Sequence, residues 1–369
     1  MLRREVHDHV EWPVELAEFR RLAEAAGFEI VGEVVQTRIA PHGGLLLGPG
    51  KVEELAARVE AEAIDAVVVY NVLSSMQKFK LQGAFRCEVL DRYEVVLRVF
   101  EREARDRVSQ LQLELARLQK GYPFIKLGQR EVMRRERSTR GVGAGPGEYS
   151  YHSELRQQRK RLANVKGELE GLRREKLQRL HTRLELGIPL VCLVGCYNAG
   201  KTTLFNALTG AQMEVSDRPF TTLASKYARA TNAGMLFVDT IGFALGLDPE
   251  LISAFQLNLD DMRHADVVLL LVDAADEPVL LGMKLRTALR ILRSTGIDQR
   301  RILVVLNKAD LAGARLEKEA VPVVSKLGGL EWVAVSATTG ENLDTLVTRI
   351  ARRYAEVGTV QPDADREAG

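Results

Sequence analysis

Residues 195–202 (GCYNAGKT) fit the phosphate-binding loop pattern GxxxxGK[ST]. They follow the apolar run 188–194, which is typical of a buried strand, and precede residues 203–208, which begin like a helix. Successive backbone N–H groups and the positive end of that helix can cradle phosphate oxygens, with the lysine at the β- and γ-phosphates and a hydroxyl on Mg²⁺. The residues predicted to contact the nucleotide here are Gly195, Tyr197, Asn198, Ala199, Gly200, Lys201, Thr202 and Thr203.

Two motifs further along the chain predict the parts that sense the γ-phosphate. Residues 239–242 (DTIG) follow an apolar run, so the carboxylate can hold Mg²⁺ through water and the Gly242 N–H can meet the γ-phosphate. Residues 220–222 (FTT) form a candidate first switch, in which a threonine closes over Mg²⁺ and the γ-phosphate. The predicted catalytic groups are Lys201, Thr222 and Gly242, and the predicted Mg²⁺ ligands are Thr202, Thr222 and Asp239.

Two more motifs predict recognition of guanine. Asn307, Lys308 and Asp310 follow an apolar run, and Asp310 would accept two hydrogen bonds from guanine N1–H and N2–H₂. Adenine lacks that pair of donors and would leave the carboxylate unpaired, at a cost of roughly 1–3 kcal/mol or more. Ser336 and Ala337 follow another apolar run and would offer a backbone N–H to guanine O6. Each motif alone also fits an ordinary turn or helix cap, but the ordered set favours a guanine-nucleotide site.

Composition is consistent with a cytosolic enzyme of two or three domains. Hydrophobic residues make up 46% of the 369 residues, and every apolar run is far shorter than the ~18 residues that span a bilayer. Residues 1–8 lack the apolar core of a secretory signal. Cys87, Cys192 and Cys196 show neither metal-ligand spacing nor a disulfide framework. We therefore expect a cytoplasmic protein in a reducing compartment.

Positive charge is concentrated in one segment of the chain. The formal net charge is +2, yet residues 100–185 hold 21 Lys and Arg against 12 Asp and Glu, a net charge of +9. A basic segment in an otherwise acidic chain predicts a polyanionic partner. The alternative is a solvated helix face rich in Arg and Glu.

The patterning divides the chain into three regions and a tail. Residues 1–99 predict a small α/β domain, and 186–356 predict a nucleotide domain with a doubly wound, mainly parallel sheet and a last helix over 341–355. Residues 357–369 predict a flexible polar tail. Residues 48–51 (GPGK) lack phosphate-loop spacing and predict a helix-entry turn. Within residues 1–99 we expect helices over 15–26 and 51–63, and a third helix that Ser74 caps and that runs past Gln82. We expect strands over 29–37, 66–70 and 94–99.

Residues 100–185 predict an antiparallel hairpin of two helices, over 100–127 and 150–185, each with an apolar stripe. The joining stretch 128–150 holds five arginines and the glycine-dense residues 141–147. Such a stretch cannot pack a core, but it lets backbone approach a ligand closely. Its flanking arginines favour a phosphate-rich surface such as RNA, and the alternative is a flexible hinge.

The chain resembles the HflX family, in the Obg-HflX group of translation-associated P-loop GTPases. The matching stretches are GPGKVEE at 48–54, LDR at 90–92, LQLELA at 111–116, RGVGAGPGE at 140–148, YNAGK at 197–201 and DTIGF at 239–243. The resemblance implies an α/β N-terminal domain, a helical hairpin and a G domain that hydrolyses GTP to GDP and phosphate with Mg²⁺. It also implies binding of the large ribosomal subunit and its rRNA, with the loop from Arg130 to Glu148 near the peptidyl-transferase centre. Some members dissociate ribosomes under stress, and some also hydrolyse ATP.

Two features of the sequence bear on turnover. Phe243 stands where Ras-like proteins place the glutamine that orients water, which predicts slow intrinsic hydrolysis and acceleration by the ribosome. Asn198 stands where related GTPases use an asparagine to help bind K⁺, and the alternative is that it only hydrogen-bonds the loop.

We expect a protein that is monomeric when free, binds the large subunit in its GTP state and is released by hydrolysis. Two other functions stay open: a GTPase of large-subunit assembly, and a nucleotide-gated RNA-binding module with little turnover. After Glu148 the chain reads YSYHSE rather than the family's usual TQLE, so the RNA contact differs in detail.

Overall fold

The computed structural model describes residues 2–3, 11–140, 146–216, 218–230, 234–247, 249–326 and 329–358. Their contacts form two compact units. One unit comprises Met1–Leu172 with Asp248–Ala254, and the other comprises Arg173–Leu247 with Phe255–Gly369. Each unit has a hydrophobic core of its own. The finer division at residues 99, 185 and 356 stays a prediction.

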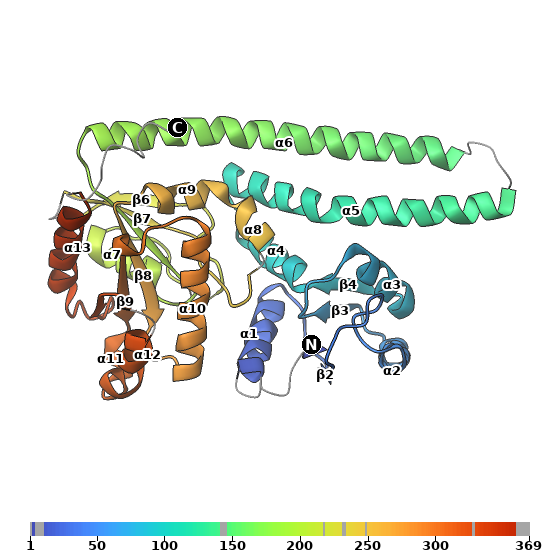
Figure 1. Ribbon diagram of the computed structural model, residues 1–369, viewed down its shortest axis with the longest axis horizontal. Helices are drawn as coiled ribbons and strands as arrows, with labels where there is room; N and C mark the ends of the chain where they lie inside the picture. Colours follow the sequence, from blue (N-terminus) through green and yellow to red (C-terminus); the bar gives the residue numbers. More distant parts are fainter. Residues whose placement is uncertain are drawn as a thin grey trace. The chain divides into compact units, whose positions relative to one another are not determined.

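The first unit contains the predicted small α/β region. Its elements are β1 Leu2–Arg3, α1 Glu11–Ala25, β2 Gln36–Thr37, α2 Pro49–Ala61, β3 Ala66–Val69, α3 Ser75–Phe85, β4 Glu88–Asp91 and α4 Arg92–Glu103 (Figure 1). Strands β1 and β2 pair parallel, and so do β3 and β4. A core cluster that includes Val52, Leu81 and Val89 packs helices α2 and α3 on β4. Short parallel strands joined by helices are the pattern that the sequence predicted for this region.

Two helix starts in this unit follow from local chemistry. Gly48 is the N-cap of α2 and Pro49 is its first residue, where a missing N–H costs nothing, so residues 48–51 form the predicted helix-entry turn. Ser74 caps α3, since its hydroxyl accepts a hydrogen bond from the Gln77 N–H at 3.3 Å and the Gln77 side chain reaches back to the Ser74 N–H. This reciprocal capping confirms Ser74 as the start of a helix.

The strand predicted over 94–99 is wrong, because α4 occupies Arg92–Glu103. Valines suggested a strand, but Asp91 accepts a hydrogen bond from the Glu94 N–H at 3.0 Å and begins a helix. The neighbouring strand is β4 (Glu88–Asp91), which ends before this stretch. The strand predicted over 29–37 is likewise limited to Gln36–Thr37. In residues 92–103, the helix cap at Asp91 outweighed the β propensity of the valines.

Helices α5 (Arg107–Arg140) and α6 (Pro146–Glu185) are the two long helices in Figure 1. Arg107 pairs with Glu168, Glu114 with Arg161, and Tyr122 with Arg159. Because the residue numbers of the partners on α6 fall as those on α5 rise, the two helices are antiparallel, as predicted.

The bounds of the two helices differ from the prediction. Helix α5 begins at Arg107, not at 100, and continues to Arg140 through much of the expected joining stretch 128–150. Residues 141–145 and the tail from 359 lie outside the described residues, and so does this part of the predicted RNA-contact loop.

The second unit is built on a six-stranded sheet. Its strands are ordered β10-β9-β8-β5-β7-β6, and all neighbouring pairs are parallel except β6 with β7. This arrangement confirms the mainly parallel sheet that the sequence predicted. The bounds are β5 Leu190–Gly195, β6 Lys226–Arg229, β7 Leu236–Asp239, β8 Val267–Asp273, β9 Ile302–Asn307 and β10 Trp332–Ala334.

Helices cover both faces of this sheet. Helices α7 (Lys201–Thr209) and α13 (Leu343–Gly358) share a buried cluster with one face, which includes Val191, Leu204 and Leu346. Helix α10 (Pro278–Ser294) packs on β5 and β8 without joining that cluster, so it covers the other face (Figure 1). Coverage of both faces makes the sheet doubly wound. The remaining helices are α8 Pro249–Ala254, which belongs to the first unit, and α9 Gln256–His264, α11 Ala309–Ala312 and α12 Val321–Lys326.

None of the helices in the described part of the chain combines the length and apolar character that crossing a bilayer requires.

Candidate nucleotide site

The turn between β5 and α7 contains the predicted phosphate loop. At Gly195 φ is +145°, and a Cβ there would lie 2.2 Å from the backbone oxygen of Leu271 on β8. At Gly200, the N-cap of α7, φ is +83° and a Cβ would lie 2.2 Å from Asn307 Nδ2. Both positions therefore require glycine. Asn198 is exposed in the same turn with φ of +61°.

Lys201 begins α7 and folds back over the loop. Its Nζ donates to the carbonyl oxygens of Gly195 at 3.1 Å and Cys196 at 3.0 Å, and the residue is only 7% exposed. Burial lowers the pKa of Lys201, and the Asp239 carboxylate acts in the opposite direction. The carbonyl contacts and the nearby carboxylate hold the ammonium group at the mouth of the loop, where phosphates are predicted to bind.

The structure brings the three predicted Mg²⁺ ligands together. Thr202 Oγ1 donates to Asp239 Oδ2 at 2.8 Å, Thr222 Oγ1 donates to the same oxygen at 3.1 Å, and the two hydroxyl oxygens are 3.4 Å apart. Asp239 is 1% exposed, and burial raises its pKa against the opposing effect of Lys201 and the two threonines. Asp239 Oδ1 is buried and has no hydrogen-bond partner among the described residues.

These residues fit a magnesium ion. A buried carboxylate oxygen without a donor is an unsatisfied acceptor that a cation or its water can satisfy. The described residues contain no group of three or more His, Cys, Asp and Glu side chains that could hold a metal by themselves. Mg²⁺ commonly binds one carboxylate together with hydroxyls, water and substrate phosphates, which is the set available here.

The DxxG segment is fastened to the phosphate loop by its backbone. The Phe243 N–H donates to the Gly195 oxygen at 3.0 Å, and the Tyr197 N–H donates to the Phe243 oxygen at 2.8 Å. A Cβ on Gly242 would lie 3.1 Å from Lys201 Nζ and 3.2 Å from Tyr197 Cα. Gly242 therefore lies against the loop that it is predicted to sense. Phe243 is 2% exposed, so its ring is part of the core and its backbone makes the connection, which the sequence did not indicate.

The Asn-Lys-x-Asp motif contributes two structural contacts. Asn307 is 1% exposed, and its Nδ2 donates to the Ala199 oxygen at 2.9 Å while its Oδ1 accepts from the Ala337 N–H at 3.1 Å. Asn307 thus joins the phosphate loop to the Ser336–Ala337 turn. Lys308, with φ of +62°, pairs with Asp273 Oδ2 at 2.6 Å. Sequence reasoning missed Asp273, although it ends a buried apolar run as Asp239 does.

Asp310 and the Ser336–Ala337 turn are the predicted guanine contacts. The Asp310 side chain is exposed on α11, where it is accessible to a base. The Ser336 N–H donates to the Glu341 oxygen at 3.2 Å, and the Ala337 N–H is the one that donates to Asn307. A contact to guanine O6 would therefore need the Ala337 N–H to be shared with Asn307 or released from it, and it stays a prediction.

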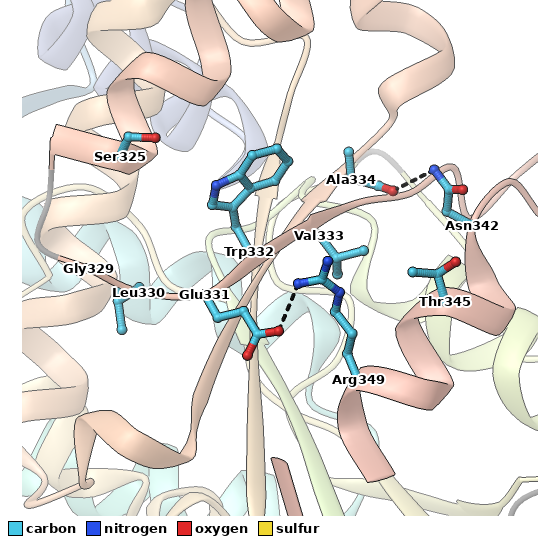
Figure 2. A pocket seen from close by; sticks show the side chains of 10 residues that line it. All are labelled: Ser325, Gly329, Leu330, Glu331, Trp332, Val333, Ala334, Asn342, Thr345 and Arg349. Atoms are coloured by element: carbon cyan, nitrogen blue, oxygen red, sulfur yellow. Dashed lines mark hydrogen bonds and ion pairs between the residues drawn. The ribbon is translucent and has the colours of Figure 1, made fainter. Parts of the chain in front are cut away.

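A separate cavity of about 710 Å³ lies beside β10. Figure 2 shows its lining, in which Arg349 on α13 meets Glu331 and Asn342 Nδ2 donates to the Ala334 oxygen at 3.0 Å. None of the residues predicted to contact the nucleotide lines this cavity.

The doubly wound sheet carries a glycine-rich phosphate loop, the cluster of Thr202, Thr222 and Asp239, and the Asn-Lys-x-Asp motif. These features together define a P-loop GTPase. Residues 190–308 match a family model described as 50S ribosome-binding GTPase, and residues 14–101 match one described as GTP-binding GTPase N-terminal. The chain belongs to the HflX family of GTPases, which binds and hydrolyses GTP.

Three relatives show how far the similarity extends. The GTPase HflX of Thermococcus kodakarensis is 34% identical over 353 residues, which cover 93% of this chain and 79% of the relative. That of Hyperthermus butylicus is 33% identical and covers 92% of both chains. That of Escherichia coli is 32% identical and covers 92% of this chain and 79% of the relative. Among solved structures, a GTP-binding protein from Sulfolobus solfataricus in complex with GDP is 22% identical, with a TM-score of 0.46, over 96% of this chain and 98% of that chain.

Proposed function

We propose that this GTPase binds the large ribosomal subunit in its GTP state, dissociates or silences ribosomes under stress, and is released when GTP is hydrolysed. The observation that carries the proposal is the match of residues 190–308 to a family of 50S ribosome-binding GTPases. The net charge of +9 over residues 100–185 supports it, because neutralisation of RNA phosphates by Lys and Arg is the main source of affinity for RNA. We propose that the loop from Arg130 to Glu148 contacts the ribosomal RNA. The proposed location is the cytoplasm, and the proposed state of the free protein is a monomer.

The proposed chemistry follows from the arrangement around Lys201. The loop N–H groups and Lys201 bind the phosphates, and Gly242 senses the γ-phosphate. A bound Mg²⁺ would be held by Thr202, Thr222 and Asp239 and would neutralise charge on the phosphate oxygens. The other proposed nucleotide contacts are Gly195, Tyr197, Asn198, Ala199, Gly200, Thr203, Asn307, Lys308, Asp310, Ser336 and Ala337.

Turnover is proposed to be slow in the free protein, because the buried Phe243 ring cannot orient water. Asn198 is an exposed residue of the phosphate loop, and we propose that it helps to bind K⁺, whose charge would assist hydrolysis. Comparison of GTP turnover in KCl and NaCl tests this role, and equal rates would exclude it.

Co-sedimentation with cognate ribosomes on sucrose gradients tests the main proposal, with GDP or a non-hydrolysable GTP analogue present. We expect the analogue to move the protein onto the large subunit and to deplete intact ribosomes. Binding only to precursor particles would indicate a GTPase of large-subunit assembly instead. Binding without any stimulation of hydrolysis would indicate a nucleotide-gated RNA-binding module. Protein at the top of the gradient in both states would contradict ribosome binding.

A further inference from the structure

Helix α9 carries three buried polar side chains that belong to none of the nucleotide-binding motifs. Asn258 is 2% exposed, and Asp260 and Asp261 are both 0% exposed. Two adjacent carboxylates buried on a helix of nine residues are costly unless each has a cation and hydrogen-bond donors. Their partners therefore show what this helix does.

Asn258 and Asp261 hold the chain that follows the predicted first switch. Asn258 Nδ2 donates to the oxygen of Leu223, the residue after Thr222, at 2.8 Å. Asp261 Oδ2 accepts from the Ser225 hydroxyl, and Asp261 Oδ1 accepts from the Tyr227 hydroxyl on β6. Residues 223–227 are thus fixed to α9 at three points.

A cation from α6 pairs with Asp261. Lys176 Nζ donates to Asp261 Oδ2 and to the Leu257 oxygen, each at 2.5 Å. Asp260, the neighbour on the same helix, pairs with a different α6 residue: Arg173 donates to its two oxygens at 2.7 and 3.2 Å. Within the described part of the chain, the Asp260 side chain contacts Arg173 and Arg263 and no residue of 223–227. The two carboxylates are therefore alike in burial and charge but differ in what they hold.

We propose that Asn258 and Asp261 are positioning residues for GTP hydrolysis, which anchor residues 223–227 so that Thr222 stays at Asp239. The inference rests on the proposed role of Thr222 at the metal. Thr222 already donates to Asp239 at 3.1 Å, so the anchored segment presents its hydroxyl in place. When the anchors are lost, Thr222 occupies this position for a smaller fraction of the time. Apparent affinity for the GTP state then falls by that fraction, and hydrolysis slows with it.

The test compares Asp261→Asn with Asp260→Asn. Both substitutions remove one buried charge from α9 and one ion pair with α6, so both should lower Tm. Only Asp261→Asn loosens residues 223–227. We expect it to lower kcat and to weaken binding of a GTP analogue with Mg²⁺ by about tenfold, the size of one hydrogen bond to a charged group, with GDP affinity unchanged. We expect Asp260→Asn to keep kcat and analogue affinity at the wild-type values.

Two more variants keep the test decisive if Asp261→Asn does not fold. Tyr227→Phe removes one of the two hydroxyls from which Asp261 accepts, while Ser225 and Lys176 still contact the carboxylate. We expect a severalfold loss of kcat and a smaller fall in Tm than Asp261→Asn gives. Thr222→Ala reports on the proposed role of Thr222 itself. If Thr222→Ala lowers kcat while Tyr227→Phe does not, the positioning role is overturned and the role of Thr222 stands. Equal losses of kcat in Asp260→Asn and Asp261→Asn would also overturn it. If Thr222→Ala keeps the wild-type kcat, the proposed role of Thr222 is the one that fails.

Discussion

Gly195 and Gly200 lie where the phosphate loop passes closest to other backbone and side chains. At Gly195 the obstacle to a side chain is the Leu271 carbonyl, which is fixed in the sheet between β5 and β8. At Gly200 the obstacle is Asn307, which is itself tied to the Ala337 N–H. The motif glycines are therefore needed for packing as well as for exposing N–H groups to phosphate.

Substitution Gly195→Ala should abolish nucleotide binding and destabilise the protein by about 1–3 kcal/mol, because the new Cβ forces β5 away from Leu271 or strains φ. Equilibrium binding of GDP and urea unfolding measure the two effects. Gly50→Ala is the control, since a Cβ there meets nothing within 4 Å. It should change stability by less than about 1 kcal/mol. Wild-type GDP affinity in Gly195→Ala would contradict the prediction.

Asp310 should decide which base is bound. In Asp310→Asn an amide NH₂ replaces one acceptor oxygen and opposes a guanine donor, so GTP affinity should fall by about tenfold to a hundredfold. Xanthosine triphosphate has a carbonyl in place of the guanine amino group and should bind the variant better than the wild type. Competition binding with both nucleotides measures this exchange. Because Asp310 is exposed, Tm should stay the same, and a parallel loss of both nucleotides would point to misfolding instead.

At the scale of elements, Glu331 connects the start of β10 to α13. Arg349 Nη1 lies 2.7 Å from Glu331 Oε1, and Arg353 pairs with Oε2 (Figure 2 shows the Arg349 contact). Burial raises the pKa of Glu331, but hydrogen bonds from Arg353 and Arg349 outweigh it, so the pKa lies below the usual 4.5. The charged form is therefore favoured in the folded protein.

Substitution Glu331→Gln should lower the free energy of unfolding by about 1 kcal/mol at neutral pH. A carboxylate with a depressed pKa stabilises the fold above its unfolded pKa of 4.5, and this contribution is lost as pH falls through the lower folded value. The difference between wild type and variant should therefore shrink below pH 4.5. Urea unfolding at several pH values measures it, with the exposed Glu341→Gln as control. If the difference in unfolding free energy between wild type and variant stayed constant down to about pH 3, the charge of Glu331 would not be the cause of that difference.

At the scale of the whole molecule, charge is segregated along the chain while the net charge is only +2. Most of the basic segment 100–185 lies in α5 and α6, and its arginines pair partly with glutamates across the two helices. Such exposed pairs contribute little to stability, so the remaining positive charge is available to a polyanion.

The proposed ribosome binding should therefore weaken as salt increases. Between about 50 and about 200 mM KCl we expect a loss of at least tenfold in affinity for the large subunit, because each neutralised phosphate releases a counterion. Sedimentation at each salt concentration measures it, and GDP affinity measured alongside controls for an effect on the G domain. Affinity that does not depend on salt would place the main contact outside the basic hairpin.

The sequence located the candidate nucleotide site, because glycine, lysine, threonine and aspartate at fixed spacing after apolar runs have few other uses. The predicted loop, Thr202, Thr222 and Asp239 do meet, although they come from separate strands and loops. Helix starts at Gly48 and Ser74 were also predictable, since caps depend on residues a few positions apart.

Local sequence alone did not reveal which elements lie against each other. Valines over 94–99 suggested a strand, but capping by Asp91 and burial on the core of the first unit made a helix. Nothing in the local sequence indicated that the Phe243 backbone binds the phosphate loop, or that Asp261 contacts Ser225 and Tyr227. These contacts join residues far apart in the chain, and their energy comes from burial that exists only in the folded protein. The order and spacing of the motif residues indicate the chemistry of the site, whereas the groups that hold those residues in position follow from tertiary packing.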